Sequence, residues 1–143
     1  MSSVLKAKRG ETKFDILIKA RMLCKYTLEI TTNENVFDPR YKTVLTDNID
    51  KLALDIYINL FEANNIDIRK TNPNLKQDYE LRRLLVTKAI RNCYNLLALI
   101  QLAKPIFHLK SKRIEYWGQM VIDVRDMARK LRNSDKDRTA NVL

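Results

Sequence analysis

The chain has little glycine, proline or cysteine, and each shortage excludes a class of protein. Two glycines and three prolines in 143 residues cannot supply the frequent turns of an all-β sandwich or barrel, nor a glycine-rich phosphate loop. Two cysteines, Cys24 and Cys93, are too few for a disulfide scaffold and lack the spacing of a zinc site. Both fall on apolar helical positions, so we expect two reduced cysteines in the core.

Histidine and long apolar runs are also scarce. His108 is the only histidine, so the chain by itself cannot assemble a Ser-His or Cys-His pair or a multi-histidine metal site. We therefore expect a protein that is not an enzyme, with no catalytic residue, no metal and no cofactor. No run approaches the roughly 20 apolar residues of a membrane span, and no apolar segment follows the basic start. These absences predict a cytoplasmic location.

Apolar residues recur at helical spacing in four segments. The spacing predicts helices over residues 11–31, from residue 39 or a turn later to 63, over 75–104 and over 111–132. The predicted inward residues are Phe14, Leu17, Ile18, Cys24 and Leu28; Leu45, Ile49, Leu52, Ile56 and Leu60; Val86, Ala89, Cys93, Leu96, Ile100 and Ala103; and Ile114, Trp117, Val121, Val124, Ala128 and Leu131. The predicted fold class is all-α, an antiparallel up-down four-helix bundle.

The ends of these helices follow from local signals. Asp38 before Pro39 predicts an N-cap, Asn74 predicts another with Gln77 three residues later, and Ser111 a third. Pro105 is expected to stop the third helix. We expect one domain over residues 1–143, with a mobile basic arm at 1–10 and a flexible tail at 133–143.

Basic residues outnumber acidic ones, 27 to 17, which gives a formal net charge of +10. Residues 36–70 are the exception, with 5 basic and 6 acidic side chains, and this segment is suited to packing or partner contact. Such an excess attracts RNA, DNA or another polyanion, because Lys and Arg neutralise phosphates. The predicted nucleic-acid-binding residues are Arg82, Arg83, Lys88, Arg91, Lys112, Arg113, Arg125, Arg129 and Arg132.

A plainer interpretation of these side chains is an ordinary solvated surface, partly paired with Glu80, Asp123 and Asp126. Asp47, Asp50 and Asp55 are likewise interpreted as solvated charges or as charges favoured by the helix dipole. Tyr79, Tyr94 and Tyr116 are candidates for base stacking and equally for the edge of the core. Binding to a membrane surface ranks below nucleic acid, because all four helices are needed for the core.

Several stretches resemble one known family. They read PRYKxxLTDNIDKLALDI (39–56), LFEAN (60–64), LIQLAK (99–104), SKRxEYW (111–117) and VRDM (124–127). They are similar to stretches of the bacterial accessory variability determinant proteins and of the related four-helix proteins encoded in ribosomal RNA intervening sequences. The resemblance spans roughly residues 14–132.

This resemblance implies a homopentamer of four-helix protomers whose basic surface binds RNA and DNA. In diversity-generating retroelements, such a protein partners a reverse transcriptase and the template RNA in mutagenic complementary-DNA synthesis, without polymerase activity of its own. Two hypotheses therefore stand: a nucleic-acid-binding accessory subunit, and a structural or adaptor bundle whose charges keep it in solution.

Overall fold

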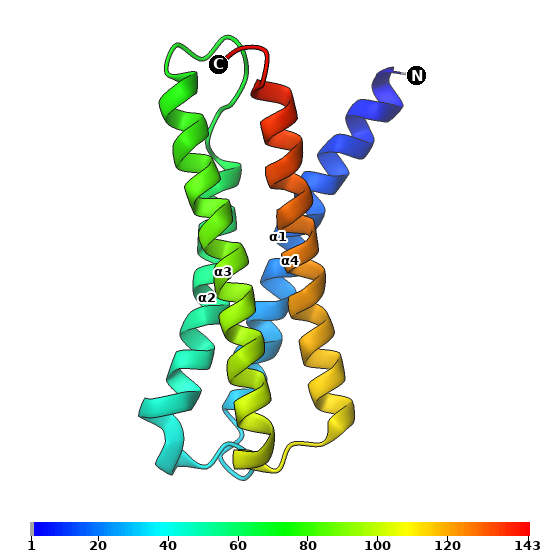
Figure 1. The fold of residues 1–143 in the computed structure, drawn as a ribbon. Helices are drawn as coiled ribbons and strands as arrows, with labels where there is room; N and C mark the ends of the chain where they lie inside the picture. The colour runs from blue at the N-terminus through cyan, green and yellow to red at the C-terminus, as the bar shows by residue number, and fades with distance from the viewer. Residues whose placement is uncertain (1) are drawn as a thin grey trace.

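The protein folds as four long helices, shown as a computed structural model in Figure 1. The structure describes the backbone of residues 2–143 and the side chains of residues 15–143. The helices are α1 (Ser2–Thr31), α2 (Asp47–Asn64), α3 (Leu75–Phe107) and α4 (Ser111–Thr139). A short 3-10 helix, η1 (Pro39–Tyr41), and a π-helical turn, η2 (Lys42–Thr46), precede α2. Residues 2–143 contain no strand, so the all-α prediction is confirmed.

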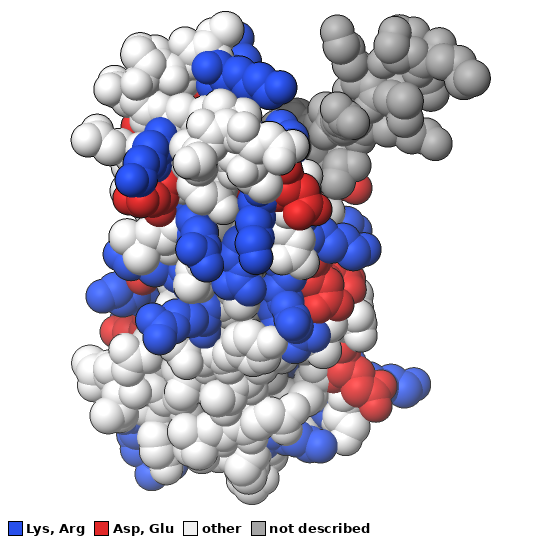
Figure 2. All heavy atoms as spheres, turned by 45° about the horizontal axis from the view of Figure 1, so that its top comes forward, with Lys and Arg blue, Asp and Glu red and all other residues white. Residues whose placement is uncertain are grey.

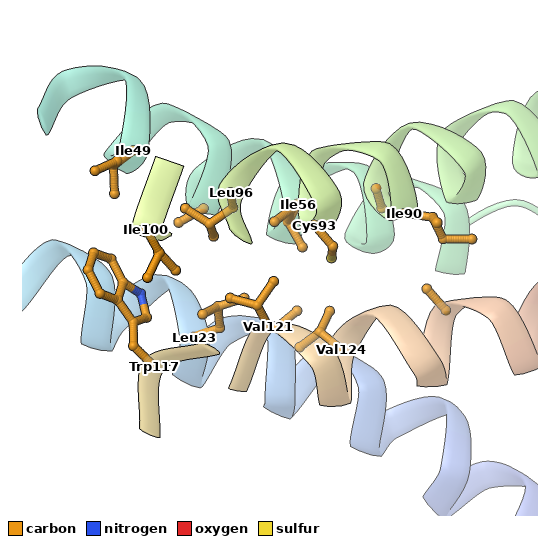
Figure 3. Close-up of a cluster of buried hydrophobic side chains, with 14 of the residues drawn as sticks. Leu23, Ile49, Ile56, Ile90, Cys93, Leu96, Ile100, Trp117, Val121 and Val124 are labelled. Carbon is orange, nitrogen blue, oxygen red and sulfur yellow. The ribbon is translucent and has the colours of Figure 1, made fainter. Parts of the chain in front are cut away.

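The helices pack side by side around one apolar core, an arrangement compatible with a four-helix bundle. α2 contacts α3, α3 contacts α4, and α1 contacts both α2 and α4. Figure 3 shows Leu23, Ile56, Cys93 and Val121 pointing towards one another from α1, α2, α3 and α4. Burial of this apolar surface is the main force that holds the helices together.

The predicted core stripes are confirmed for α2, α3 and α4, apart from Leu52 and Leu131, which are half-buried. The stripe predicted for the first helix is wrong in part. Leu28 is exposed, Leu17 and Ile18 are half-buried, and the side chain of Phe14 lies outside the described residues. The inward face of α1 is instead made by Ile16, Ala20, Leu23, Cys24, Thr27 and Thr31.

Buried threonines on α1 explain this error, because their hydroxyls have partners that the sequence does not show. The indole Nε1 of Trp117 donates a hydrogen bond of 2.9 Å to Thr27 Oγ1. Thr31 Oγ1 donates to Asp50 Oδ1 at 2.7 Å. These bonds satisfy groups that would be costly to bury alone, so polar residues occupy positions where apolar ones were expected.

The structure corrects the predicted start of the first helix and the predicted end of the third. Residues 2–10, expected as a mobile arm, form the start of α1, since one interior glycine, Gly10, costs only about 1 kcal/mol relative to alanine. α3 continues past Pro105 to Phe107, whose ring packs on Phe37 with a centroid distance of 4.9 Å. Left-handed His108 (φ 53°) closes this helix, and the N–H groups of His108 and Leu109 bond to Lys104 O.

The capping predictions are only partly confirmed. Asp38 accepts a hydrogen bond from the Arg40 N–H, and Pro39 begins η1 as expected. Asn74 precedes α3 but makes no capping bond with its side chain, and Asn72 Oδ1 accepts from the Asn74 N–H instead. Ser111 is the first residue of α4 and not its cap.

A buried ion pair holds the ends of three helices together. Arg82 and Asp135 are only 2% and 3% exposed. Arg82 Nε donates to Asp135 Oδ2 at 2.6 Å, and its NH2 to Oδ1 at 3.1 Å. Its NH1 donates to Ala63 O at the end of α2. The flexible tail predicted from residue 133 is therefore wrong as far as Thr139, because Asp135 and Thr139 face inward and extend α4.

Replacing one partner of this pair should destabilise the fold. Asp135→Asn leaves the Arg82 charge buried without its carboxylate, so the free energy of unfolding should fall by about 3–5 kcal/mol. Urea unfolding, followed by circular dichroism, measures this free energy. The matched control is Asp126→Asn, which removes an exposed carboxylate paired with half-buried Arg125 on α4, and it should cost less than about 1 kcal/mol. Equal, small losses in both variants would contradict the assignment.

Candidate nucleic-acid interface

Helical periodicity brings most of the predicted arginines to one face. On α3, Arg83 and Arg91 lie four residues either side of Thr87, and Tyr94 follows a turn later. On α4, the spacing of Arg125, Arg129 and Arg132 places them on one side of the helix. Because α3 and α4 are neighbours, the two rows can meet.

Three contacts show that the rows do meet. The guanidinium carbon of Arg125 lies 5.2 Å from the centroid of the Tyr94 ring, a cation–π distance. Arg129 NH1 lies 3.4 Å from Tyr94 Oη. Arg132 NH1 lies 3.3 Å from Thr87 Oγ1. Tyr94 and Thr87 thus connect the basic residues of the two helices.

We call this surface the basic strip; it consists of Arg83, Lys88, Arg91, Arg125, Arg129 and Arg132. Figure 2 shows Lys and Arg gathered in a band across the face of α3 and α4, above a largely uncharged part of the surface. Within residues 15–143, the only ion pair of the strip joins Arg125 NH2 to Asp126 Oδ1 at 3.0 Å. The strip therefore carries a clear excess of positive charge, which attracts polyanions.

Three of the predicted binding residues do not join the strip. Arg82 is buried against Asp135 and cannot reach a phosphate, so its prediction as a binding residue is wrong. Of the adjacent pair Arg82 and Arg83, Arg82 faces the core and Arg83 faces outward. Lys112 and Arg113 lie in the first turn of α4. They are about 18 Å from the level of Arg125 along that helix, at 1.5 Å per residue.

A polar groove lies beside the strip, between α2 and α3. It has a volume of about 650 Å³ and is lined by Asp55, Asn59, Lys88, Arg91, Asn92, Tyr94 and Asn95. Its asparagines belong to no motif in the sequence, and Asp55 was expected as a solvated charge or one favoured by the helix dipole. Asn92 and Asn95 are three residues apart, and Asp55 and Asn59 four, but only the contact of α2 with α3 brings the pairs together.

The tyrosines considered for stacking have different surroundings. Tyr94 is 46% exposed and lies between the strip and the groove. Tyr116 packs edge-on against Tyr26, with ring centroids 5.1 Å apart. Tyr79 is half-buried near the start of α3. Tyr94 therefore combines an exposed ring with the neighbouring Arg125, whereas the ring of Tyr116, which is 58% exposed, packs against another aromatic ring.

The acidic residues of α2 also differ from one another. Asp47 is exposed and pairs with Lys42. Asp50 is half-buried, and burial is the main cause that raises its pKa, against the hydrogen bond from Thr31, which lowers it. Asp55 lines the groove. Asp47 and Asp50 lie in the first turn of α2, where the helix dipole favours a carboxylate. The interpretation as a solvated charge needs correction only for Asp50, whose carboxylate is half-buried and accepts a hydrogen bond from Thr31.

Both cysteines lie in the core, as predicted, and are unpaired. Burial raises the pKa of the Cys93 thiol to about 12. Burial also raises the pKa of Cys24, and the nearby charge of Asp50 adds to it. Among residues 15–143, no group of three or more His, Cys, Asp or Glu side chains is placed to hold a metal ion. His108 is exposed at the end of α3.

Cys93 should resist thiol reagents in the folded protein. The thiolate is the reactive form, and with a pKa of about 12 only about one thiol in ten thousand is ionised at pH 8. We expect peptide mapping to find Cys93 unmodified after iodoacetamide treatment at pH 8, and fully modified in denaturant. Modification of the folded protein at the rate of a free cysteine would contradict the burial of this side chain.

The fold and the strip together define a four-helix protein with one strongly basic face. Comparison with protein-family models, curated proteins and solved structures finds no match for the chain. No helix in the described part of the chain has both the length and the apolar character to cross a membrane.

Proposed function

We propose that this protein is a non-catalytic nucleic-acid-binding protein that holds phosphate backbones on its basic strip. The observation that carries the proposal is the meeting of Arg125, Arg129 and Arg132 with the α3 row at Tyr94 and Thr87. Guanidinium groups bind phosphate oxygens in pairs of hydrogen bonds. Binding through the strip positions the nucleic acid and carries little sequence information by itself.

The cellular role that we propose rests on the resemblance described above. In this role, the protein is a cytoplasmic accessory subunit of a diversity-generating retroelement. It presents template RNA to a reverse transcriptase during mutagenic complementary-DNA synthesis. The alternative is a structural or adaptor protein of the ribosomal intervening-sequence type, without a retroelement role. A reverse transcriptase gene and variable repeats beside the gene for this protein would favour the first role, and their absence the second.

The proposal also includes an antiparallel up-down order of the helices and association of several copies. Short connections between α2 and α3, and between α3 and α4, support the antiparallel order. An apolar face on α2 supports the association: Leu54, Ile58 and Phe61 follow one another at helical spacing and are 45%, 41% and 46% exposed. Beside it, an apolar groove of about 540 Å³ between α1 and α2 includes Leu28, Leu54 and Tyr57.

The strip can be tested by its salt dependence. Replacing Arg125, Arg129 and Arg132 together by Gln keeps much of each aliphatic stem and removes three positive charges. We expect weaker binding to single-stranded RNA, and a plot of log affinity against log salt that is shallower by about 2, at roughly 0.7 per phosphate contact. Fluorescence anisotropy across a salt series measures both quantities.

The control for this experiment is the Lys112→Gln, Arg113→Gln variant, which removes charge at the other end of α4. It should change the salt dependence less than the triple variant. Circular dichroism should show that both variants fold. If the wild-type protein binds no nucleic acid at low salt, or if the triple variant binds unchanged, the strip is not a phosphate-binding surface.

Association through α2 predicts a specific effect of Ile58→Glu. A charge on this apolar face would have to be buried between copies, which is unfavourable. Light scattering should give a multiple of the 16.8 kDa chain mass for the wild type and a smaller mass for the variant. Leu102→Glu is the control, because Leu102 is 49% exposed on α3, away from α2's apolar face. A monomeric wild type would disprove association.

A further inference from the structure

The groove between α2 and α3 differs from the strip beside it in its chemistry. Lys88 and Arg91 belong to both surfaces, and Tyr94 lines the groove beside the strip. Asp55, Asn59, Asn92 and Asn95 belong to the groove alone. We call these last four residues the amide cluster. Three of them carry an amide with two N–H donors and one carbonyl acceptor, and the fourth carries a carboxylate that only accepts.

The polar atoms of the amide cluster are available to a ligand. Among residues 15–143, none of its four side chains forms a hydrogen bond or an ion pair with another protein group, in contrast to Asn72, which bonds to Asp67 O and Asp78. Asn59, Asn92 and Asp55 are half-buried, and Asn95 is exposed. The groove therefore presents several free donors and acceptors on two rigid helices, as a small polar binding site would need.

The carboxylate of Asp55 favours a base over a phosphate as the part of a nucleic acid that enters the groove. A phosphate beside this carboxylate would meet a like charge, which is unfavourable at short distance. A nucleobase has no charge, and its amino groups are donors that a carboxylate accepts. Asp and Glu accept from the N4 amino group of cytosine in just this way. In uracil the N3–H donor lies between two carbonyl oxygens, which the carboxylate repels.

The neighbours of the groove suit a single strand. Lys88 and Arg91 can bind the phosphates on either side of a base that enters the groove. Tyr94 offers an aromatic ring against which a base can stack, and the nearby Arg125 guanidinium reinforces it. In a duplex, the Watson–Crick edge of each base is already paired, so the groove would reach only part of what an unpaired base offers.

We propose that the groove binds an unpaired nucleotide whose base carries an exocyclic amino group, such as cytosine, while the basic strip holds the adjoining phosphates. This inference rests on the proposed function, because the strip must bind the backbone first. It adds a preference among bases to a surface that otherwise recognises only charge.

The test compares oligocytidine and oligouridine of equal length, because the two bases have the same ring size and differ mainly at this edge. The wild-type protein should bind oligocytidine about 5-fold more tightly, near the lower end of the discrimination that a specific base contact provides. Asp55→Asn, which keeps the size of the side chain, should reduce this ratio to near 1. Anisotropy titrations at one fixed salt concentration measure all four affinities.

Asp126→Asn is the matched control. It removes the same charge beside Arg125 but lies outside the groove, so it should strengthen binding of both oligonucleotides and leave their ratio unchanged. Asn95→Ala is a second variant at an exposed position, so it should fold. It should weaken oligocytidine binding without changing the salt dependence, because no charge is lost.

The outcomes separate this inference from the proposed function. Equal affinity of the wild type for the two oligonucleotides would overturn the base site and leave the phosphate-binding strip in place. The same conclusion would follow if Asp55→Asn strengthened both by the same factor as Asp126→Asn, since the groove would then sense charge only. Failure to bind either oligonucleotide at low salt would overturn the strip and the groove together.

Discussion

The buried pair of Arg82 and Asp135 fixes how α4 lies against α3 and the end of α2. Its two hydrogen bonds join α3 to α4, and a third bond reaches Ala63 O. A charge pair in the core tolerates little movement, because any loss of contact would leave a charge without a partner. This constraint and the buried apolar stripe from Ile114 to Ala128 together set the rotation of α4. With Asp135 facing inward, Arg132, Arg129 and Arg125 lie along the edge that meets Thr87 and Tyr94.

The same rotation separates two kinds of surface. The α3 and α4 face carries the basic strip, and α2 exposes Leu54, Ile58 and Phe61. The separation agrees with the charge along the sequence, since residues 36–70 carry one more acidic than basic side chain. The proposed phosphate binding and the proposed association of copies would use different faces, because phosphates favour basic side chains and association favours apolar contact.

The groove is formed by polar side chains at the edge of the contact between α2 and α3. Asp55 and Asn59 come from α2, and Asn92 and Asn95 from α3. Their own stripes place apolar residues such as Ile56 and Cys93 in the core, so the adjacent polar residues line the edge of the interface. The proposed base site depends on this edge, and the proposed phosphate-binding surface is the strip beside it.

The amino-acid sequence by itself determined the number of helices, most of their inward faces and the excess of positive charge. Periodicity is a local property, and it identified the stripes from Leu45 to Leu60, from Val86 to Ala103 and from Ile114 to Ala128. It failed on α1, where Thr27 and Thr31 are buried because Trp117 and Asp50 supply partners from other helices. Only the tertiary structure buried Arg82 beside exposed Arg83, brought Arg125 and Arg129 to Tyr94 and formed the groove at Asp55. Each of these depends on which helices become neighbours and how they are rotated.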